Sequence, residues 1–367
     1  MSGRVRVGII GTGSIADAHL YAYQKAEGRA KIAAVVDVQQ DRAARAAERF
    51  GVPEIMTDYR TLLARDDIDA VSICTPPSLH VEMSVAALAA GKHVLCEKPV
   101  APTLSDLDRI EQAQKESGSI FSGVFQLRFG KGAQQLRWLL DEGRMGKIHL
   151  GMAETLWYRD ADYFAVPWRA TWADQCGGVT VSQAIHLIDA LIWCLGRPTR
   201  VYASASTVRA LTECEETCVA VIDFENGAIG QITSTVAAAG PEKSRLEVFG
   251  TTGSASSTGT AYDSTSEPFA IGMPDPAVAE KLAAEMEEKV PRAYRMLHRG
   301  QVEDFLSAIV DARPPAIGVD ECRAVLQVTA GIYKSAMTGQ AVDLPISPDD
   351  PWYNTLVPGG AMLAGLN

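Results

Sequence analysis

A glycine-rich turn directly after the first predicted strand constrains this chain more than any other feature. The segment "VGIIGTGSIADAH" places Gly11 and Gly13 between an apolar strand and a helix, with Ala16 in the third small position. In such a G-x-G-x-x-A turn the first glycine allows a tight bend, the second lets the backbone approach a pyrophosphate, and the third small residue lets the helix pack closely on the strand. The helix N-terminus then faces the phosphates. The turn therefore predicts a dinucleotide-binding α/β domain.

An acidic residue at the end of the second predicted strand distinguishes between two dinucleotides. Asp37 lies 24 residues after Gly13. A carboxylate there can accept hydrogen bonds from a ribose diol and repels a 2′-phosphate, which favours NAD over NADP. Val38 follows where an NADP enzyme offers Arg or Ser, whereas Arg42 is close enough to keep NADP open. A Rossmann-like domain without a dinucleotide is the alternative interpretation.

Short strands and helices alternate over the first third of the chain. Such alternation predicts a parallel sheet with helices on both faces. We therefore expect an α/β fold that begins with an NAD-binding Rossmann domain over residues 1–126. Gly91 and Gly118 stand where helices of that domain end.

The pattern changes after residue 126. Strands then follow one another with few helices between them, and "FENGA" places Asn226 and Gly227 at a hairpin turn. We expect residues 127–367 to form a substrate-binding and oligomerisation α/β domain with an open, mainly antiparallel sheet. One face of the sheet should remain available for subunit contacts. The helices expected on the other face span 178–195, 294–312 and 320–338.

Composition excludes several classes of function. The formal charge is −11 and no basic patch stands out, so we expect no nucleic-acid partner. No apolar run approaches the roughly 20 residues of a membrane span, and a strand begins within ten residues of Met1, so we expect a cytoplasmic protein without membrane contact. The seven cysteines form no CxxC pair and no zinc-ligand pattern. They predict reduced, mostly buried thiols and no metal site.

A lysine follows the fourth strand predicted in the first domain. In "HVLCEKPVAPT" the strand ends at Glu97, Lys98 and Pro99. Ligands of open α/β sheets bind at the carboxyl ends of the strands. A lysine placed there can bond a substrate hydroxyl and pass protons, and Pro99 fixes the turn that follows. A solvated strand end is the alternative.

A histidine lies on an unusual helix stripe in the second domain. In "GGVTVSQAIHLID" a helical rotation of about 100° per residue places Ser182, His186, Asp189 and Trp193 on one side. The stripe has no Lys or Glu, which indicates a cleft wall or a buried polar network. Taken alone, His186 fits a structural role as well as a catalytic one. Asp189 either orients His186 or is a structural acid.

Aromatic and arginine residues gather before that helix, in "LWYRDADYFAVPWRATW". Aromatic faces stack on sugar rings, and arginine binds hydroxyls or carboxylates. We expect Trp157 and Phe164 to belong to the core. The residues we expect to contact substrate are Lys98, Tyr158, Tyr163, Arg169, Trp172, Ser182 and His186. The stretch 291–298, with Tyr294 and His298, is a further candidate for closing the pocket.

The motifs together resemble one known family. The glycine turn, "TPPSLH" at 75–80, "CEKPVA" around Lys98 and "PWRATW" before the GG-x-H helix look like the Gfo/Idh/MocA oxidoreductases, over nearly the whole chain. The resemblance implies NAD, with Lys98 as the catalytic lysine. It also implies a homo-oligomer, which we expect to be a dimer or tetramer. An exposed position at the helix N-terminus is the alternative for His80. The residues assigned to the cofactor are Gly11, Thr12, Gly13, Ser14, Ile15, Asp37, Val38, Arg42, Cys74, Thr75, Pro76, Pro77, His80, Glu97, Lys98, Gln126, Trp168 and Arg169.

One position departs from the family pattern. Members usually carry D-x-x-x-H on the second-domain helix, and this chain has Ser182 at the aspartate position. Serine is not a base at neutral pH. Either Lys98 and His186 carry proton transfer with Ser182 as a hydrogen-bonding relay, or the substrate differs from the polyols of the Asp-bearing members.

These observations predict an NAD-dependent dehydrogenase that acts on a sugar, a sugar derivative or a polyol. Lys98 and His186 are its expected catalytic residues. Two alternatives stay open. One is a hydrolase or lyase that uses NAD transiently on a glycoside, and the other is a non-catalytic NAD-linked regulator.

Overall fold

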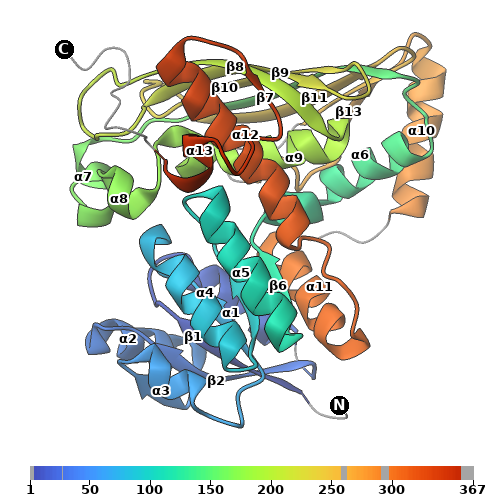
Figure 1. Ribbon diagram of the computed structural model, residues 1–367. Coiled ribbons are helices and arrows are strands. Elements are labelled where there is room, and N and C mark those ends of the chain that lie inside the picture. Colours follow the sequence, from blue (N-terminus) through green and yellow to red (C-terminus); the bar gives the residue numbers. More distant parts are fainter. Residues whose placement is uncertain (1–3, 27, 258–262, 291–296, 357–367) are drawn as a thin grey trace. The chain divides into compact units, whose positions relative to one another are not determined.

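Two compact units make up the chain (Figure 1). The computed structural model describes residues 4–26, 28–257, 263–290 and 297–356. One unit combines Met1–Phe125 with His298–Cys322, and the other combines Gln126–Leu297 with Arg323–Asn367. The second unit therefore is not a single continuous stretch of sequence.

The first unit contains a six-stranded parallel sheet in the order β3-β2-β1-β4-β5-β6. Strand order reverses between β1 and β4, which is where open α/β sheets bind ligands at the carboxyl ends of the strands. The expected α/β sheet is confirmed. Its strands are β1 (Val5–Ile10), β2 (Ala30–Val36), β3 (Glu54–Met56), β4 (Ala70–Ile73), β5 (His93–Cys96) and β6 (Phe121–Gly123). Its helices are α1 (Ala16–Lys25), α2 (Gln40–Phe50), α3 (Tyr59–Leu63), α4 (His80–Ala89), α5 (Leu104–Ser117) and α11 (Leu297–Asp311).

Helix α11 belongs to the first unit, although we expected a helix over 294–312 to cover the second sheet. Its side chains Val302, Phe305 and Leu306 are buried in the same apolar cluster as Val5 and Leu20. The expectation was wrong because periodicity shows that a helix has an apolar face but not which sheet that face covers. Residues 294–296 of the expected helix, and Tyr294 with them, lie outside the described residues.

The second unit contains an eight-stranded sheet in the order β13-β12-β11-β7-β10-β9-β8-β14. Only the β7–β10 pair is parallel among the strand pairs of this described sheet, so the expected mainly antiparallel sheet is confirmed. The expected hairpin at Asn226 and Gly227 joins β9 and β10. The strands are β7 (Ile148–Leu156), β8 (Pro198–Ser206), β9 (Thr217–Phe224), β10 (Ile229–Thr235), β11 (Lys243–Gly250), β12 (Ser254–Ser256), β13 (Ala270–Gly272) and β14 (Val342–Asp343).

Helices pack on one face of this sheet. Helix α9 packs so closely on β7 that a Cβ on Gly151 would lie 2.7 Å from side-chain atoms of Leu191 and Leu195. Helix α12 lies on β8, where the Ser335 hydroxyl accepts the Ala203 N–H. The helices outside the first unit's set are α6 (Lys131–Asp141), α7 (Ala161–Phe164), α8 (Trp172–Gln175), α9 (Ile185–Leu195), α10 (Pro276–Lys289), α12 (Val319–Thr338) and α13 (Pro351–Asn354), and short 3₁₀ or π segments span Pro77–Leu79, Gln126–Phe129, Pro167–Arg169 and Thr180–Ala184.

One helical stretch is long and apolar enough to cross a membrane by length and composition. It spans Trp172–Leu195, and 78% of its most apolar window is buried inside the protein. Our expectation that no such stretch exists was wrong on length. A buried helix that is apolar all round is typical of the centre of a large core as well as of a membrane span.

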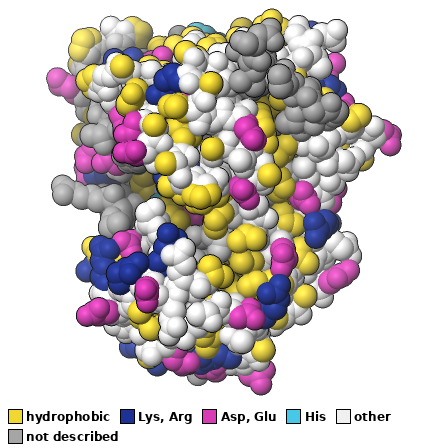
Figure 2. Space-filling view, turned by 90° about the vertical axis from the view of Figure 1, so that its left-hand side faces the viewer, with side chains coloured by type: hydrophobic (Ala, Val, Ile, Leu, Met, Phe, Trp, Pro, Cys, Tyr) yellow, Lys and Arg dark blue, Asp and Glu magenta, His cyan; other side chains and the backbone are white. Residues whose placement is uncertain are grey.

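Charged side chains are interspersed on the face of the molecule drawn in Figure 2. Among the residues coloured by type there, lysines and arginines form small groups between aspartates and glutamates. This distribution agrees with the formal charge of −11 and gives that face no extended basic surface of the kind that nucleic-acid binding requires.

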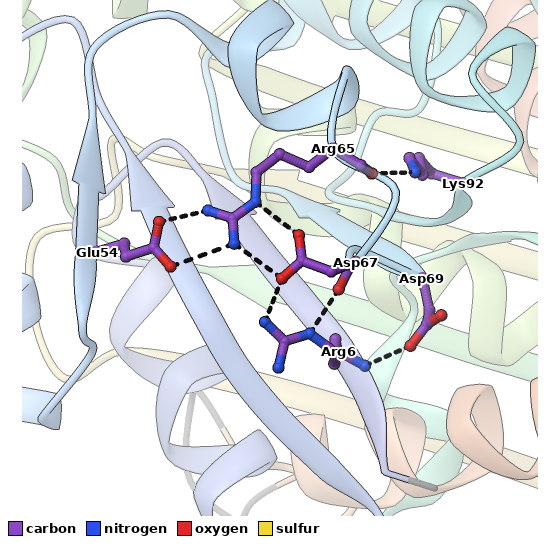
Figure 3. A network of polar contacts seen from close by, with 6 residues as sticks. All are labelled: Arg6, Glu54, Arg65, Asp67, Asp69 and Lys92. Carbon is purple, nitrogen blue, oxygen red and sulfur yellow. Dashed lines mark hydrogen bonds and ion pairs between the residues drawn. The ribbon is translucent and has the colours of Figure 1, made fainter.

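An ion-pair network ties the amino-terminal edge of the first sheet (Figure 3). Arg65 contacts the carboxylates of Glu54 and Asp67, and Asp67 also contacts Arg6. The Arg6 N–H donates to Asp69 at 2.7 Å. Hydrogen bonds from Arg65 lower the pKa of Asp67. Since these groups lie at the start of β4 rather than at its carboxyl end, the network is structural.

A buried ion pair anchors α9. The Asp189 carboxylate is fully buried and accepts two hydrogen bonds from Arg128, at 2.8 Å from Nε and 2.6 Å from Nη2. Arg128 lies in the 3₁₀ segment Gln126–Phe129. The structure therefore favours the structural interpretation of Asp189.

We expect Asp189→Asn to lower the free energy of unfolding by about 3–5 kcal/mol, because it leaves the buried guanidinium without its counter-charge. Urea unfolding followed by tryptophan fluorescence measures this change directly, since all six tryptophans lie in the second unit.

Asp141→Asn is the matched control. It removes a carboxylate from the exposed pair with Arg137 and should change stability by less than about 1 kcal/mol. Equal stability of the two variants would contradict a structural role for the Arg128–Asp189 pair.

Candidate functional site

The glycine turn lies where β1 and β4 end. Gly11 has φ +88°, and a Cβ there would approach the Cys74 carbonyl oxygen to 2.7 Å. Its N–H donates to the Val36 carbonyl at 2.7 Å. Only glycine combines this backbone angle with this approach, so Gly11 sets the bend between β1 and α1.

The second glycine borders open space. A Cβ on Gly13 would meet no described atom within 4 Å. Ala16, in contrast, is buried against the sheet, and its N–H donates to the Gly13 carbonyl. Thr12 and Ile15 are half-buried and Ser14 is exposed at the start of α1. The turn therefore fits a pyrophosphate, with room for backbone approach and a helix N-terminus beside it.

Asp37 fastens this turn to the end of β2. Its Oδ2 accepts the N–H and the hydroxyl of Thr12, both at 2.9 Å, and its Oδ1 accepts the Gln39 N–H at 2.9 Å. A carboxylate has about four acceptor positions, so capacity remains for a ribose hydroxyl. Val38 beside it is 87% exposed, and Arg42 is exposed on α2.

The loop after β4 is held from behind by a histidine. Thr75 and Pro76 are half-buried, while Cys74 and Pro77 are buried. The fully buried His80 ring places Nε2 2.9 Å from the Thr75 carbonyl oxygen and Nδ1 2.8 Å from that of Pro99. The exposed alternative considered for His80 is therefore wrong.

The Glu97–Lys98 turn rests on a buried carboxylate. Glu97 is 5% exposed. Its Oε1 lies 2.9 Å from Nε2 of His19 and 3.6 Å from Nε2 of His298, and its Oε2 accepts the Lys98 N–H at 3.2 Å. Burial alone would raise the pKa of Glu97, but the contacts with the two histidines hold it well below the usual value. Lys98 itself is half-buried directly after this anchor.

Sequence reasoning did not foresee the roles of His19 and His298 beside Glu97. A signal existed for His19, which lies with Ala16, Leu20 and Tyr23 on the buried face of α1. One ring nitrogen each of His19 and His298 and one carboxylate oxygen of Glu97 all lie within 4.8 Å of one another, so these three atoms could hold a metal ion. The hydrogen bond between His19 and Glu97 accounts for this cluster better than a metal ion does. A metal-bound histidine usually donates its other N–H to an acceptor, and Nδ1 of His19 is buried without a partner in the described structure.

Aromatic rings and an arginine converge in the second unit. The Arg169 guanidinium lies 4.2 Å from the Tyr163 ring centroid and 5.0 Å from that of Trp168. The Tyr163 hydroxyl accepts a hydrogen bond from Gln183 at 2.8 Å. This places three of the expected residues together. Trp157 and Phe164 are buried as expected.

The other aromatic candidates make contacts of their own. Tyr158 is 45% exposed beneath the guanidinium of Arg209. Trp172 donates its indole N–H to the Glu213 carbonyl at 3.0 Å and packs edge-on against Tyr333. Gln126 is half-buried in its 3₁₀ segment, with a buried Oε1 that has no hydrogen-bond partner among the described residues.

The helix that carries Ser182 and His186 begins with a π segment, Thr180–Ala184, before α9. A uniform rotation of 100° per residue therefore does not describe its first turn, and the expected single stripe is wrong there. Such π segments occur frequently at functional sites. The Ser182 N–H donates to the Gly178 carbonyl at 2.9 Å, and both Ser182 and His186 are half-buried.

A buried glutamate anchors this helix start. The Glu215 carboxylate accepts the N–H groups of Gly178 and Thr180, each at 2.9 Å, and the Tyr333 hydroxyl at 3.1 Å. Burial raises the pKa of Glu215. The acid supplies acceptors for N–H groups that the helix itself leaves unsatisfied.

Comparison with known proteins gives consistent matches over both units. A family model described as an oxidoreductase family with an NAD-binding Rossmann fold matches residues 5–125, and the model of the GFO/IDH/MocA C-terminal domain matches residues 133–256. Myo-inositol 2-dehydrogenase of Thermotoga maritima is 26% identical over 93% of this chain and 98% of its own length. D-glucoside 3-dehydrogenase of Escherichia coli is 27% identical over 94% and 98%, respectively.

Solved structures agree with these matches. The WlbA dehydrogenase from Bordetella pertussis, crystallised with NADH and UDP-GlcNAcA, superimposes with a TM-score of 0.85 at 25% identity, covering 95% of this chain and 99% of that one. The two matched family models together span more than half of the sequence, and this chain therefore belongs to the Gfo/Idh/MocA family of NAD-binding oxidoreductases.

Proposed function

We propose that the protein oxidises a hydroxyl group of a sugar, a sugar derivative or a polyol, or reduces the corresponding carbonyl, with NAD. The observation that carries this proposal is the placement of Lys98 directly after a buried, hydrogen-bonded Glu97 at the carboxyl end of β5. That edge of the sheet also holds the open glycine turn. The relatives that act on myo-inositol and on D-glucosides support the substrate class.

Each proposed residue has one task. Bound NAD supplies the hydride acceptor, C4 of its nicotinamide. Lys98 accepts the proton of the reacting hydroxyl as its carbon loses hydride, and His186 is the second proton-transfer residue. Tyr158, Tyr163, Arg169 and Trp172 contact the sugar. Serine at 182 can bond a hydroxyl but cannot act as the base that aspartate provides.

We expect Lys98→Met and His186→Ala each to lower kcat by about 100-fold or more, because each removes a proton-transfer group. The assay follows reduced-cofactor absorbance over a panel of sugars and polyols with NAD and with NADP. Lys31→Met, at an exposed lysine of β2, is the control and should keep wild-type turnover.

Near-normal turnover of both variants would contradict the assignment of Lys98 and His186 as proton-transfer residues. Release of sugar without accumulation of NADH would instead indicate a hydrolase or lyase that uses NAD transiently. NADH binding without turnover on any substrate would indicate a regulator.

Cofactor choice is proposed to rest on Asp37, with NAD preferred over NADP. We expect Asp37→Ser to weaken NADH binding about tenfold or more, because hydrogen bonds to an ionised carboxylate are worth about 1.5–3 kcal/mol. Fluorescence titration with NADH and NADPH measures both affinities.

Asp37 also holds Thr12, so Thr12→Val serves as the control that removes only the hydroxyl bond to the same carboxylate. Equal loss in the two variants would show that Asp37 acts through the turn rather than on the ribose.

The exposed face of the second sheet is the proposed subunit interface. Tyr202 and Val221 are cross-strand neighbours on β8 and β9, 53% and 45% exposed, and Val219 and Ile229 are exposed on the same sheet. Apolar side chains grouped on an open sheet face favour burial against another surface. We propose a homo-oligomer, a dimer or a tetramer. We also propose a cytoplasmic location, in keeping with seven buried cysteines.

We expect Val221→Asp to lower the mass measured by light scattering to that of a monomer, because a carboxylate would be buried in the contact. Val278→Asp, at a 50% exposed valine of α10, is the control and should leave the mass unchanged. A monomeric wild-type protein would refute the interface.

A further inference from the structure

His80 sits between two hydrogen-bond acceptors. It opens α4 and is completely buried. Its Nδ1 lies 2.8 Å from the carbonyl oxygen of Pro99, and its Nε2 lies 2.9 Å from that of Thr75. Both distances are those of good hydrogen bonds. The ring thus bridges the loop after β4 and the turn after β5.

The two acceptors fix the number of protons on the ring. A carbonyl oxygen only accepts, whereas a neutral imidazole has one N–H and one lone pair. A neutral His80 would therefore hold its own lone pair against a carbonyl lone pair at 2.9 Å or less. The imidazolium has two N–H groups and satisfies both carbonyls at once.

Some of the surroundings of His80 favour the charged ring, and others oppose it. Burial is the largest influence and leaves the pKa of His80 below its usual value, although the hydrogen bonds to Pro99 and Thr75 and the negative charge of Glu97 raise it; Lys98 lowers it further. Burial raises the pKa of Glu97, but the contacts with His19 and His298 hold it well below its usual value. A permanent carboxylate near His80 thus supplies the counter-charge that a buried cation requires.

We propose that the two carbonyl acceptors outweigh the effect of burial, so that His80 is an imidazolium at neutral pH and is the positioning residue that fixes the Lys98 turn against the Thr75 loop. The charge has a second consequence. Since Lys98 and His80 interact electrostatically, a positive His80 favours the neutral amine of Lys98, the form that accepts a proton. The consequence for Lys98 rests on the proposed function, whereas the charge and the bridging contacts of His80 do not.

Nitrogen NMR of the wild-type protein tests the charge directly. The chain has six histidines, so labelling with ¹⁵N-histidine gives six rings, and His80→Gln assigns the one that disappears. We expect both nitrogens of His80 to carry protons at pH 7. An unprotonated nitrogen on His80 at that pH would overturn the inference.

Two variants test the positioning role. His80→Gln removes the cation, and His93→Gln, the control, removes the ring that accepts the Ile120 N–H at 2.9 Å at the other end of β5. We expect His80→Gln to lower kcat at least about tenfold through misplacement of Lys98, and to shift the acid limb of the kcat profile to higher pH. His93→Gln should leave both unchanged.

The outcomes separate this inference from the proposed function. A doubly protonated His80 in a protein that oxidises no sugar supports the inference and overturns the function. A His80→Gln variant that folds and matches His93→Gln in kcat and in pH profile overturns the positioning role. If His80→Gln does not fold, the wild-type NMR experiment still decides the charge, with His80 assigned by elimination from variants of the other five histidines.

Discussion

A buried carboxylate holds the chemistry-bearing part of the first unit in place. Glu97 contacts α1 through His19, α11 through His298 and its own turn through the Lys98 N–H. An ionised carboxylate taken out of water without such partners would cost several kcal/mol. The first unit therefore needs α11 for polar reasons as well as for its apolar face. This explains why a helix so distant in sequence packs with the Rossmann sheet.

The second unit uses the same device. Glu215 accepts the first N–H groups of the helix that carries Ser182 and His186, and Asp189 ties the middle of that helix to Arg128. Apolar packing alone tolerates small shifts, whereas paired hydrogen bonds between buried groups fix position more narrowly. In both units a segment with candidate proton-transfer groups thus begins next to a buried acid, which suits chemistry that depends on placement.

The sequence predicted what depends on local pattern and missed what depends on distant contacts. The glycine turn, the parallel sheet and the hairpin at Asn226 all follow from short-range rules of backbone geometry. The sheet on which α11 packs does not follow from such rules, because an apolar stripe does not show which sheet it covers. Apolar periodicity gave no signal for the π segment at Thr180, whose N–H is accepted by Glu215, a residue beyond the helix. His19 looked like one more residue of an apolar helix face, and only Glu97 gives it a role.

Three of the six histidines face the Glu97–Lys98–Pro99 turn, and each meets its own set of hydrogen-bond acceptors there. His19 and His298 point one nitrogen each at the Glu97 carboxylate, and a single N–H is enough for such a contact. His80 points both nitrogens at carbonyl oxygens, which only a doubly protonated ring satisfies. The three histidines around this turn thus differ in the acceptors that the fold places beside them. Because the three rings share one charge balance around Glu97, removal of any one also changes the others. The behaviour of Lys98 then depends on α1, α4 and α11 together, and no single motif carries it.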